Sequence, residues 1–554
     1  MNSGENINNY SSNNNDNNSI DNTNTSSNNI NNIANSITNS INSNDGSHRD
    51  AITTKTISTT EVTKFYRNKN VLVTGATGFL GKVLVWKLYE SCPDIGKIYV
   101  LMRSKNNLSA DKRLIQMLKA KPFCFKYHYT DLLQKFVAIE SDITTEGLGL
   151  SQSDRSLLVD QVNVVFHSAA SVRFDAPLKD NMRDNLYGTQ EIVKLCNSLK
   201  HLDAFVHVST AYSNCHQKYI SEELSPMESK IDKVTEIVET VPDDMLNEIT
   251  DKMLEGRPNT YTFTKALAEQ AVAANEGKYP IAIVRPSIVI SASREPAKGW
   301  VDNVNGIAGL GCLAAIGLLR TIDWDYYARS DMVPVDYVAN CLICSAFEVS
   351  TKSPKKLLVY NMTSGNVNPV SWGVYFEKLR SDAVTKPPTK IVRPMIYSPK
   401  YRRANPITFF MTKFFSELLF AYMVDMILVL LGYKKIMLKI TKKMHRGYSI
   451  LKPFTTNEWD FDSANVLKLS ESLEEKDREK FYFDLRKLDW DDQAEQTWHG
   501  GRTFLLKEEP TQESYKLSLG RQKIVTIVHY TGMVIIAASI ALLGFTGVNL
   551  LLRA

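Results

Sequence analysis

The stretch VLVTGATGFLGKVLVWKL, residues 71–88, decides the fold of this chain. A short apolar run enters a turn with three glycines, and apolar residues then recur at helical spacing. In such a strand, turn and helix, the first glycine permits the tight turn. The second lets a pyrophosphate approach the backbone at the helix N-terminus, and the third lets helix and strand pack closely. The pattern predicts a dinucleotide-binding unit, whose expected contact residues are Gly75, Thr77, Gly78, Phe79, Leu80 and Gly81.

Further short apolar runs alternate with segments of helical texture. They are GKIYVLMR, FVAIESD, VNVVFHSAA, AFVHVSTAY and IAIVRPSIV. Continuously apolar strands that alternate with helices are typical of a parallel sheet covered on both faces. We therefore expect an α/β fold with a doubly wound parallel-sheet Rossmann domain over residues 66–350.

The alternation is lost after about residue 354, which predicts a smaller, mainly helical C-terminal domain over residues 355–500. Before the Rossmann domain, residues 1–60 are dominated by Asn, Ser and Thr. A segment of this composition cannot bury enough apolar surface to offset the entropy of ordering, so we expect a disordered tail.

Two segments of the C-terminal part are candidates for contact with a membrane. Residues 407–432 are very apolar but carry Lys413, Glu417 and Asp425, so a buried or interfacial helix is favoured over a bilayer span. Cations then cluster in residues 433–446. They suit an anionic membrane surface or an anionic ligand, and a solvated helix face is an equal alternative.

The last apolar segment, residues 524–552, holds no Asp, Glu, Lys or Arg. About 20 apolar residues suffice to cross a bilayer, so a C-terminal membrane anchor is expected. The alternative is a pair of short interfacial helices broken near Gly544 and Gly547.

Bulk composition excludes several function classes. A net charge of +5 over 554 residues is mild, which argues against a nucleic-acid-binding protein. The seven cysteines are odd in number and scattered, so no disulfide framework is expected and a reducing, cytosol-facing environment follows. Cys341 and Cys344 form a C-x-x-C in an apolar run without a second ligand pair, and we interpret them as buried thiols rather than metal ligands.

The residues after the second and third strands bear on the choice of cofactor. An acidic residue at the end of the second strand would select NAD, but this chain has Arg103 and Lys105. A guanidinium favours the 2′-phosphate of NADPH through charge-assisted hydrogen bonds, so NADPH is the predicted cofactor. Asp142, after the third strand, could accept a hydrogen bond from the adenine amino group or act as a helix N-terminal acid.

A candidate catalytic group follows the strand that ends in HVSTAY. Tyr261 and Lys265 are one helical turn apart, and Ser209 or Thr210 supplies a hydroxyl at the strand end. These are the parts needed to protonate a carbonyl oxygen while hydride reaches its carbon. We expect Lys265 to lower the phenol pKa of Tyr261 from its usual value of ~10, and Thr210 or Ser209 to hold the substrate oxygen.

Taken together, the motifs TGATGFLG, VFHSAASVRFD, HVSTAY, YTFTKALAE, VRPSIV and DMVPVDYVAN resemble the extended short-chain dehydrogenase/reductases. In detail the chain is similar to the fatty acyl-CoA reductases over residues 68–492, and FDSANVLKL and FYFDLRKLDW suggest the second domain of that family. The resemblance implies that Tyr261 is the acid and that Thr210 is the better match for the hydroxyl. The further cofactor contacts that it implies are Arg103, Asp142, Ala169, Ala170, Lys265, Pro286, Ser287 and Ile288.

The resemblance also implies a reaction, in which a long-chain acyl-CoA is reduced to a primary alcohol with two NADPH, through an aldehyde. Its implied setting is a membrane, with the peroxisomal membrane favoured and the endoplasmic reticulum possible. Two alternatives stay open: another extended reductase acting on sterols or nucleotide sugars, and a non-catalytic NADPH-binding protein. Acyl chain length, release of the aldehyde and oligomeric state are not determined by the sequence.

Overall fold

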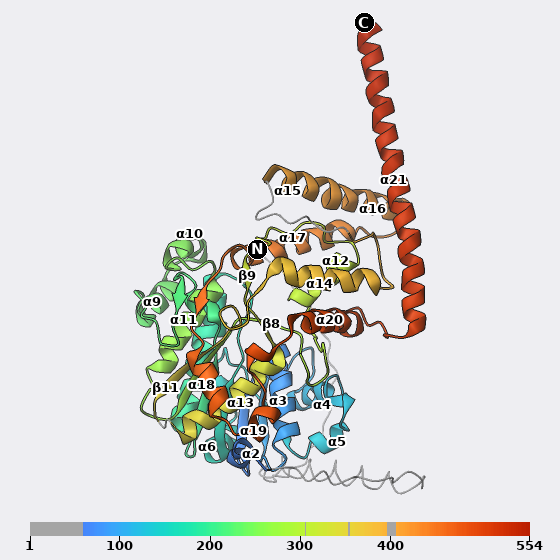
Figure 1. The fold of residues 1–554 in the computed structure, drawn as a ribbon. Coiled ribbons are helices and arrows are strands. Elements are labelled where there is room, and N and C mark those ends of the chain that lie inside the picture. Colours follow the sequence, from blue (N-terminus) through green and yellow to red (C-terminus); the bar gives the residue numbers. More distant parts are fainter. Residues whose placement is uncertain (1–58, 305, 353–354, 396–405, 554) are drawn as a thin grey trace, which may run out of the picture. The chain divides into compact units, whose positions relative to one another are not determined.

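The fold is described from a computed structural model for residues 59–304, 306–352, 355–395 and 406–553. Nearly all of the predicted Asn-rich tail, residues 1–60, lies outside the described residues. In the described residues, short continuously apolar segments form strands, and longer segments of helical periodicity form helices. Figure 1 shows the arrangement of these elements.

The core of the molecule is a seven-stranded sheet in the order β11-β7-β5-β4-β1-β2-β3, and every pairing in it is parallel. The expected strands and the Rossmann fold are confirmed. The strands are β1 (Asn70–Thr74), β2 (Ile98–Met102), β3 (Phe136–Glu140), β4 (Val162–His167), β5 (Ala204–Val208), β7 (Ile281–Pro286) and β11 (Leu357–Met362).

The sheet is buried on both faces, as its continuously apolar strands require. On β1, Val71 and Val73 pack into one apolar cluster, whereas Leu72 packs into the cluster on the opposite face. The first cluster includes α3 (Phe79–Ser91) and α13 (Val335–Thr351). The covering helices on the second face are α6 (Gln152–Gln161), α8 (Gly188–Ser198) and α11 (Thr260–Ala273).

The strand order reverses direction between β1 and β4, because β2 and β3 lie on one side of β1 and β5, β7 and β11 lie beyond β4. In open parallel sheets, ligands bind outside the carboxyl ends of the strands at such a switch point. The fold therefore places the glycine turn after β1 and the hydroxyl residues after β5 at the same edge.

The remaining elements connect or cover these layers. The other helices of the first part are α2 (Glu61–Tyr66), α4 (Ala110–Leu118), α5 (Tyr129–Leu132), α7 (Leu178–Asn181), α9 (Ile231–Thr240) and α10 (Asp243–Met253). The short strands are β6 (Tyr219–Ile220), β8 (Ile288–Ile290), β9 (Arg329–Ser330), β10 (Met332–Pro334), β12 (Val370–Ser371) and β13 (Asp460–Phe461).

The second part is mostly helical and does not begin where the sequence placed it. The expected boundary between residues 350 and 355 precedes β11, which is the edge strand of the sheet and pairs in parallel with β7. The helices α18 (Ala464–Ser472) and α19 (Glu475–Lys480) also return toward the sheet, where Val466 and Leu469 join its core.

Three further helices pack together in one apolar cluster next to the candidate site: α12 (Ile307–Ala315), α14 (Trp372–Thr385) and α20 (Trp490–Gly500). Beyond them lies a hairpin of α15 (Pro406–Thr412), η5 (Lys413–Leu418), α16 (Leu419–Leu430) and α17 (Met437–Thr456), whose α-helices are labelled in Figure 1. Most of residues 407–432 thus form helix, and their large apolar side chains are mostly exposed, so this helix is not buried. Its interfacial position stays a prediction.

The chain ends in α21 (Gln512–Arg553), a single helix without a break at Gly544 or Gly547, so the alternative of two short helices is wrong. Among the described residues it is the one helix long and apolar enough to cross a membrane, judged by length and composition. Cys341 and Cys344 are fully buried on α13, as expected for core thiols.

Candidate active site

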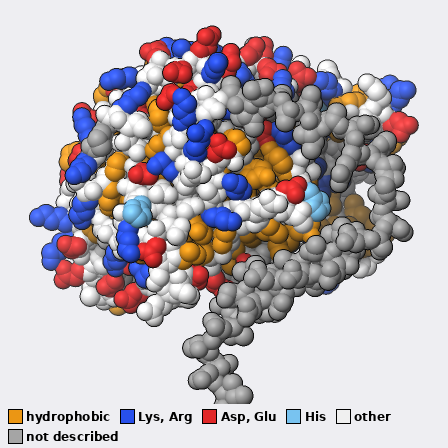
Figure 2. Space-filling model, turned by 90° about the horizontal axis from the view of Figure 1, so that it is seen from below, with side chains coloured by type: hydrophobic (Ala, Val, Ile, Leu, Met, Phe, Trp, Pro, Cys, Tyr) orange, Lys and Arg blue, Asp and Glu red, His pale blue; other side chains and the backbone are white. Residues whose placement is uncertain are grey.

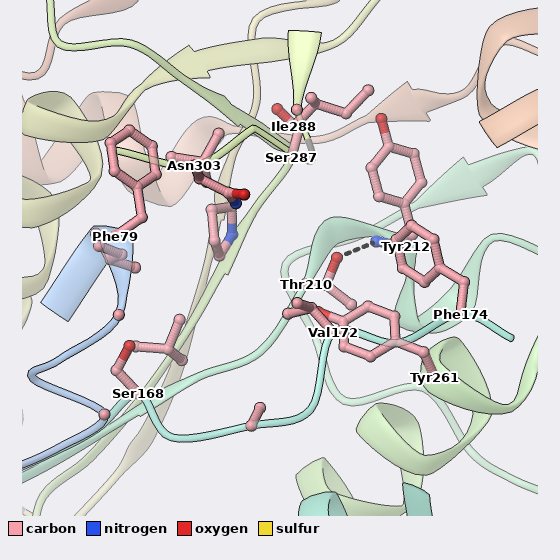
Figure 3. Close-up of a pocket in the computed structure, with 18 of the residues that line it drawn as sticks. Phe79, Ser168, Val172, Phe174, Thr210, Tyr212, Tyr261, Ser287, Ile288 and Asn303 are labelled. Atoms are coloured by element: carbon pink, nitrogen blue, oxygen red, sulfur yellow. Dashed lines mark hydrogen bonds between the residues drawn. The ribbon is translucent and has the colours of Figure 1, made fainter. Parts of the chain in front are cut away.

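A cavity of about 620 Å³ lies at the carboxyl ends of the central strands, at the switch point. Most of the predicted site residues line it, and Figure 3 shows several of them facing the same space. Those present are Gly75, Thr77, Gly78, Phe79, Leu80, Gly81, Ala170, Ser209, Thr210, Tyr261, Lys265, Pro286, Ser287 and Ile288. Ala169 is one residue from the lining, and its amide donates to the Thr74 hydroxyl at 3.0 Å.

The glycine turn has the geometry of a phosphate cradle. Gly75 has a φ of +74°, and a Cβ there would lie 2.7 Å from the backbone nitrogen of Ala169. A Cβ on Gly81 would lie 2.2 Å from the carbonyl oxygen of Gly75, so only glycine allows α3 to start this close to the turn. Gly78 is the N-cap of α3, and the first turn of that helix faces the cavity. The residues fit a dinucleotide pyrophosphate.

The cationic residues predicted for the 2′-phosphate lie beyond the cavity, at the ends of β2 and β3. Arg103 Nη1 lies 3.8 Å from Asp142 Oδ2, and the Arg103 side chain is 60% exposed. The other oxygen of Asp142 accepts hydrogen bonds from the amide and hydroxyl of Thr144, at 3.0 and 2.8 Å. The Asp142 carboxylate thus stabilises the turn in which it lies. These contacts show neither of its two expected roles, which were to accept a hydrogen bond from the adenine amino group or to act as a helix N-terminal acid. Lys105 lies in the same loop, in a bridge with Leu108.

Tyr261 is held at the start of α11 by a capped first turn. Asn259 is the N-cap and accepts a hydrogen bond from the Thr262 amide at 2.9 Å, which fixes where the helix begins. The ring of Tyr261 packs edge-on against Phe174, and the Thr210 side chain lies near its phenol. The Thr210 hydroxyl itself accepts a hydrogen bond from the Tyr212 amide at 3.3 Å. Thr210 therefore stands beside the tyrosine, as Figure 3 shows.

The expected low pKa of Tyr261 is not found. Burial raises the pKa of its phenol to about 12, and the nearby Thr210 side chain acts in the opposite direction. Lys265 Nζ donates instead to the carbonyl oxygen of Val208 at 2.6 Å, at the end of β5. The prediction was wrong because it counted the nearby ammonium and neglected the desolvation of the phenol. A phenol of this pKa is protonated at neutral pH, which is the form that a general acid needs.

Lys265 itself is desolvated. Burial lowers the pKa of its ammonium to about 8, and the charge of Glu269, one turn further along α11, opposes this shift. The lysine is thus close to its titration point near neutral pH, unlike an exposed lysine.

Ser209 and Thr210 have different surroundings, although they are neighbours. The hydroxyl of Ser209 donates to Oε1 of Glu269, which also forms a fully buried ion pair with Arg285 at 2.7 Å. Arg285, on β7, further donates to the carbonyl oxygens of Ser221 and Glu223, both at 3.0 Å. Ser209 lines the cavity but directs its hydroxyl into this network, so Thr210 is the hydroxyl presented next to Tyr261.

Comparison with known proteins agrees with this arrangement. An NAD-binding family model described as "Male sterility protein" matches residues 73–342, and a second model with the same description, of the Sterile type, matches residues 416–508. Fatty acyl-CoA reductase 1 of Rattus norvegicus is 37% identical over 449 residues, covering 81% of this chain and 87% of the relative. The Xenopus laevis protein of the same name is 38% identical over 450 residues, with the same coverage of each chain.

This chain belongs to the fatty acyl-CoA reductase family. It is therefore an oxidoreductase with a nicotinamide cofactor site. A "putative fatty acyl-CoA reductase" of Drosophila melanogaster is 35% identical over 495 residues, covering 86% of this chain and 94% of the relative.

Solved structures with the same fold as this fatty acyl-CoA reductase family member include reductase domains of peptide synthetases. The terminal R domain of the myxalamid biosynthetic pathway has a TM-score of 0.52 at 19% identity, covering 78% of this chain and 90% of that one. An R domain from Mycobacterium tuberculosis has a TM-score of 0.50 at 17% identity, with 80% and 92% covered. At this identity the likeness concerns the fold alone.

Sequence reasoning missed the far wall of the site. Leu451, Phe454 and Thr455 of α17 line the cavity together with Trp372 of α14. Phe454 also packs against Phe174 and Tyr212, so it joins the two parts of the chain at the catalytic group. The motif that carries it, KPFTT, has no spacing that relates it to Tyr261 across nearly two hundred residues, and only the tertiary fold brings them together.

Proposed function

We propose that the protein reduces a long-chain fatty acyl-CoA to a primary alcohol, with two NADPH and release of CoA through an aldehyde. The observation that carries the proposal is one cavity that joins a glycine-rich phosphate cradle, the group of Tyr261, Thr210 and Lys265, and an apolar wall. The wall residues Phe454, Leu451 and Trp372 offer a surface to an alkyl chain rather than to a sugar.

The roles of the residues follow from their positions. Bound at the cradle of Gly75, Gly78 and Gly81, the nicotinamide cofactor would supply hydride to the carbonyl carbon. Tyr261 holds its proton at the phenol oxygen and donates it to the carbonyl oxygen, while Thr210 orients that oxygen through its hydroxyl. In the first round the carbonyl belongs to a thioester, and the resulting hemithioacetal expels CoA as a thiolate. In the second round the carbonyl is that of the aldehyde.

Lys265 serves the cofactor side of the site. Its ammonium lines the cavity and is held at the end of β5 by the Val208 carbonyl, from where it would contact the nicotinamide ribose. Ser209, Glu269 and Arg285 act behind the site by fixing α11 against β5 and β7. Pro286, Ser287 and Ile288 border the cavity where the nicotinamide would lie.

NADPH is favoured over NADH by the charge at the end of β2. Arg103 and Lys105 occupy the position from which a ribose 2′-substituent is recognised, and the exposed guanidinium of Arg103 is available to a phosphate. The nearby Asp142 holds Arg103 only at 3.8 Å, so a phosphate can compete for it.

The domain division that we propose keeps a Rossmann reductase domain, extended to include β11, a helical C-terminal domain up to residue 500, and α21 as a membrane anchor from about residue 524. The absence of charged side chains in residues 524–552 supports the anchor. A catalytic domain facing the cytosol and a peroxisomal or endoplasmic reticulum membrane fit a reaction whose substrate and product partition into lipid.

The test is product analysis. Purified protein with palmitoyl-CoA and NADPH is expected to form hexadecanol, free CoA and two NADP⁺ per alcohol. A ladder of acyl-CoA lengths then gives the chain-length preference. NADPH binding without turnover of any acyl-CoA would instead favour a non-catalytic protein, and turnover only of a sterol or nucleotide sugar would favour another extended reductase.

A further inference from the structure

The first arm of the hairpin, residues 407–430, has an inverted distribution of polarity. Glu417, Ala421 and Asp425 recur every four residues, so they form one stripe, and all of them are buried against the protein. The large apolar side chains of the same helices face outward instead, among them Phe410, Phe414, Phe415, Tyr422, Met426 and Leu430. A helix at a water-facing surface shows the opposite arrangement, with its apolar stripe toward the core.

The buried acids are satisfied where they are. Glu417 accepts hydrogen bonds from the backbone amides of Arg320 and Thr321, at 2.7 and 2.9 Å, and its second oxygen lies 2.6 Å from His445 Nε2. Asp425 accepts from the amides of Ile436 and Met437 at 2.9 and 2.8 Å, which caps the start of α17. The inward stripe is therefore a built interface, and the outward apolar face is the side left for another partner.

Cations flank this apolar face. Lys434, Lys439, Lys442 and Lys443 are exposed and form no ion pair with any residue that the structure describes. By contrast, the face of the molecule at the bottom of Figure 1 carries interspersed acidic and basic side chains, as Figure 2 shows. Apolar side chains bordered by unpaired lysines suit the headgroup region of an anionic lipid leaflet.

The hairpin lies beside the proposed membrane anchor. Tyr530 of α21 and Glu417 of η5 both lie near enough to Arg320 to act on its charge, and Figure 1 shows the hairpin next to α21. From Lys523, the last cation before the apolar stretch, to Tyr530 the helix advances by about 10 Å. If α21 enters the bilayer after Lys523, the hairpin lies at the depth where interfacial helices bury their apolar faces, about 5–10 Å into the boundary of headgroups and acyl chains.

We propose that the outward face of residues 407–436 is seated in the near leaflet of a lipid bilayer, with the lysines of α17 at the headgroups. The inference rests on the proposed anchor and deepens the proposed function, because α17 borders the lipid at one end and lines the cavity with Leu451 and Phe454 at the other. The apolar wall of the active site is thus on the side of the molecule that meets the acyl chains.

A depth measurement on the full chain tests this seating. Cys124 is the exposed cysteine among those described, so Cys124→Ser gives a background in which the remaining thiols are buried. Leu430→Cys and Met245→Cys are then labelled with a thiol-reactive NBD dye and reconstituted into phosphatidylcholine and phosphatidylserine vesicles. Met245, on α10, is 56% exposed and serves as the matched control for Leu430, which is 78% exposed. Ile527→Cys reports the anchor.

We expect a lipid carrying a nitroxide at an upper acyl carbon to quench the dye at residue 430 at least twofold more than the dye at residue 245. Equal quenching at residues 430 and 245 would overturn the proposal. So would protection of residue 430 from aqueous iodide without quenching by the lipid, since that would mean a protein partner or a second copy on this face. This experiment does not measure alcohol formation, so its result does not depend on the proposed reaction. Quenching at residue 527 is measured separately and shows whether α21 enters the bilayer, independently of the hairpin.

Discussion

Glu269 and Asp425 are both buried carboxylates, but the two halves of the molecule hold them in different ways. Glu269, behind the active site, is neutralised by the guanidinium of Arg285 at 2.7 Å and accepts the Ser209 hydroxyl. Asp425, in the hairpin, faces backbone amides of the α17 N-terminus and the helix dipole that they represent. The first arrangement makes a stiff junction of helix and sheet, and the second turns a helix so that its apolar side faces outward.

The two kinds of buried carboxylate suit different tasks in the two halves of the molecule. In the reductase half, buried charges fix the positions of Tyr261 and Thr210 relative to a cofactor cradle. In the hairpin half, the carboxylates of Glu417 and Asp425 are buried, so the exposed surface of the hairpin is apolar and cationic. Substitutions in the two halves are therefore expected to differ in kind, with chemistry lost in one and attachment or local order lost in the other.

The largest effect is expected from substitution of Tyr261 in the reductase half. Tyr261→Phe removes the proton donor and is expected to lower kcat for alcohol formation by about 10²–10⁴-fold, the usual contribution of general acid catalysis. NADPH binding, followed by nicotinamide fluorescence, should be unchanged because no backbone contact is altered. Tyr212→Phe, at a second tyrosine of the cavity, is the matched control and should keep kcat within a few-fold. Equal losses in both variants would contradict the role of Tyr261.

Removing the carboxylate of Glu269 is expected to have the next largest effect, on stability. Glu269→Ala leaves Arg285 as a buried, unpaired charge, which costs about 3–5 kcal/mol. Chemical denaturation of the reconstituted protein measures the change. Glu236→Ala breaks an exposed ion pair with Lys233 and should change the free energy of unfolding by less than about 1 kcal/mol. A similar change in both variants would refute the distinction between the buried and exposed pairs.

Arg103→Ala sharpens the cofactor assignment. Loss of a hydrogen-bonded charge contact to the 2′-phosphate is expected to cost about 1.5–3 kcal/mol, so the KM for NADPH should rise by roughly 10–100-fold. The KM for NADH, which lacks that phosphate, should stay the same and is the internal control. A parallel rise in both values would mean that Arg103 supports the fold of the loop and does not select the cofactor.

The pH dependence of the reaction should report Lys265. Burial lowers the pKa of its ammonium to about 8, so the charged form predominates below that pH and is lost above it. We expect kcat/KM to fall about tenfold per pH unit above pH 8, and Lys265→Arg, which stays charged, to lack this limb. The Tyr261 phenol, with a pKa of about 12, remains protonated throughout. The stability contribution has the opposite sign, because the cost of burying the ammonium is present below pH 8 and is relieved toward pH 10.5.

Asp425→Ala should have the smallest effect, confined to the hairpin. Loss of a side chain that caps a helix N-terminus costs about 1 kcal/mol, so the first turn of α17 should exchange its amide hydrogens several-fold faster. Amide exchange measured by mass spectrometry separates this peptide from α11, whose exchange should not change. Faster exchange of α11 as well would show that the two halves are coupled more tightly than their separate buried networks indicate.

Part of the site was predictable because its signals are local. The turn of Gly75 to Gly81 and the pair of Tyr261 and Lys265 depend on spacings within one turn or one helix, and the structure brings both groups to one cavity. Local spacing left the choice between Ser209 and Thr210 open, and only the family resemblance favoured Thr210. The physical reason is distant in sequence, because Glu269, sixty residues away, accepts the Ser209 hydroxyl. The pKa of Tyr261 was predicted in the wrong direction for the same reason, since burial is a property of the packed molecule.

The sequence alone was enough to predict the parallel sheet, the glycine turn after β1, the pair of Tyr261 and Lys265 on one helix, and the apolar C-terminal segment. Each of these is written as a periodicity or a short motif whose physical cause acts over a few residues. Only the tertiary structure decided that β11 closes the edge of the sheet, that α17 completes the active-site wall with Phe454, and that Glu417 and Asp425 face inward. Those outcomes depend on which distant surfaces exclude water from one another, and no local pattern of residues records that.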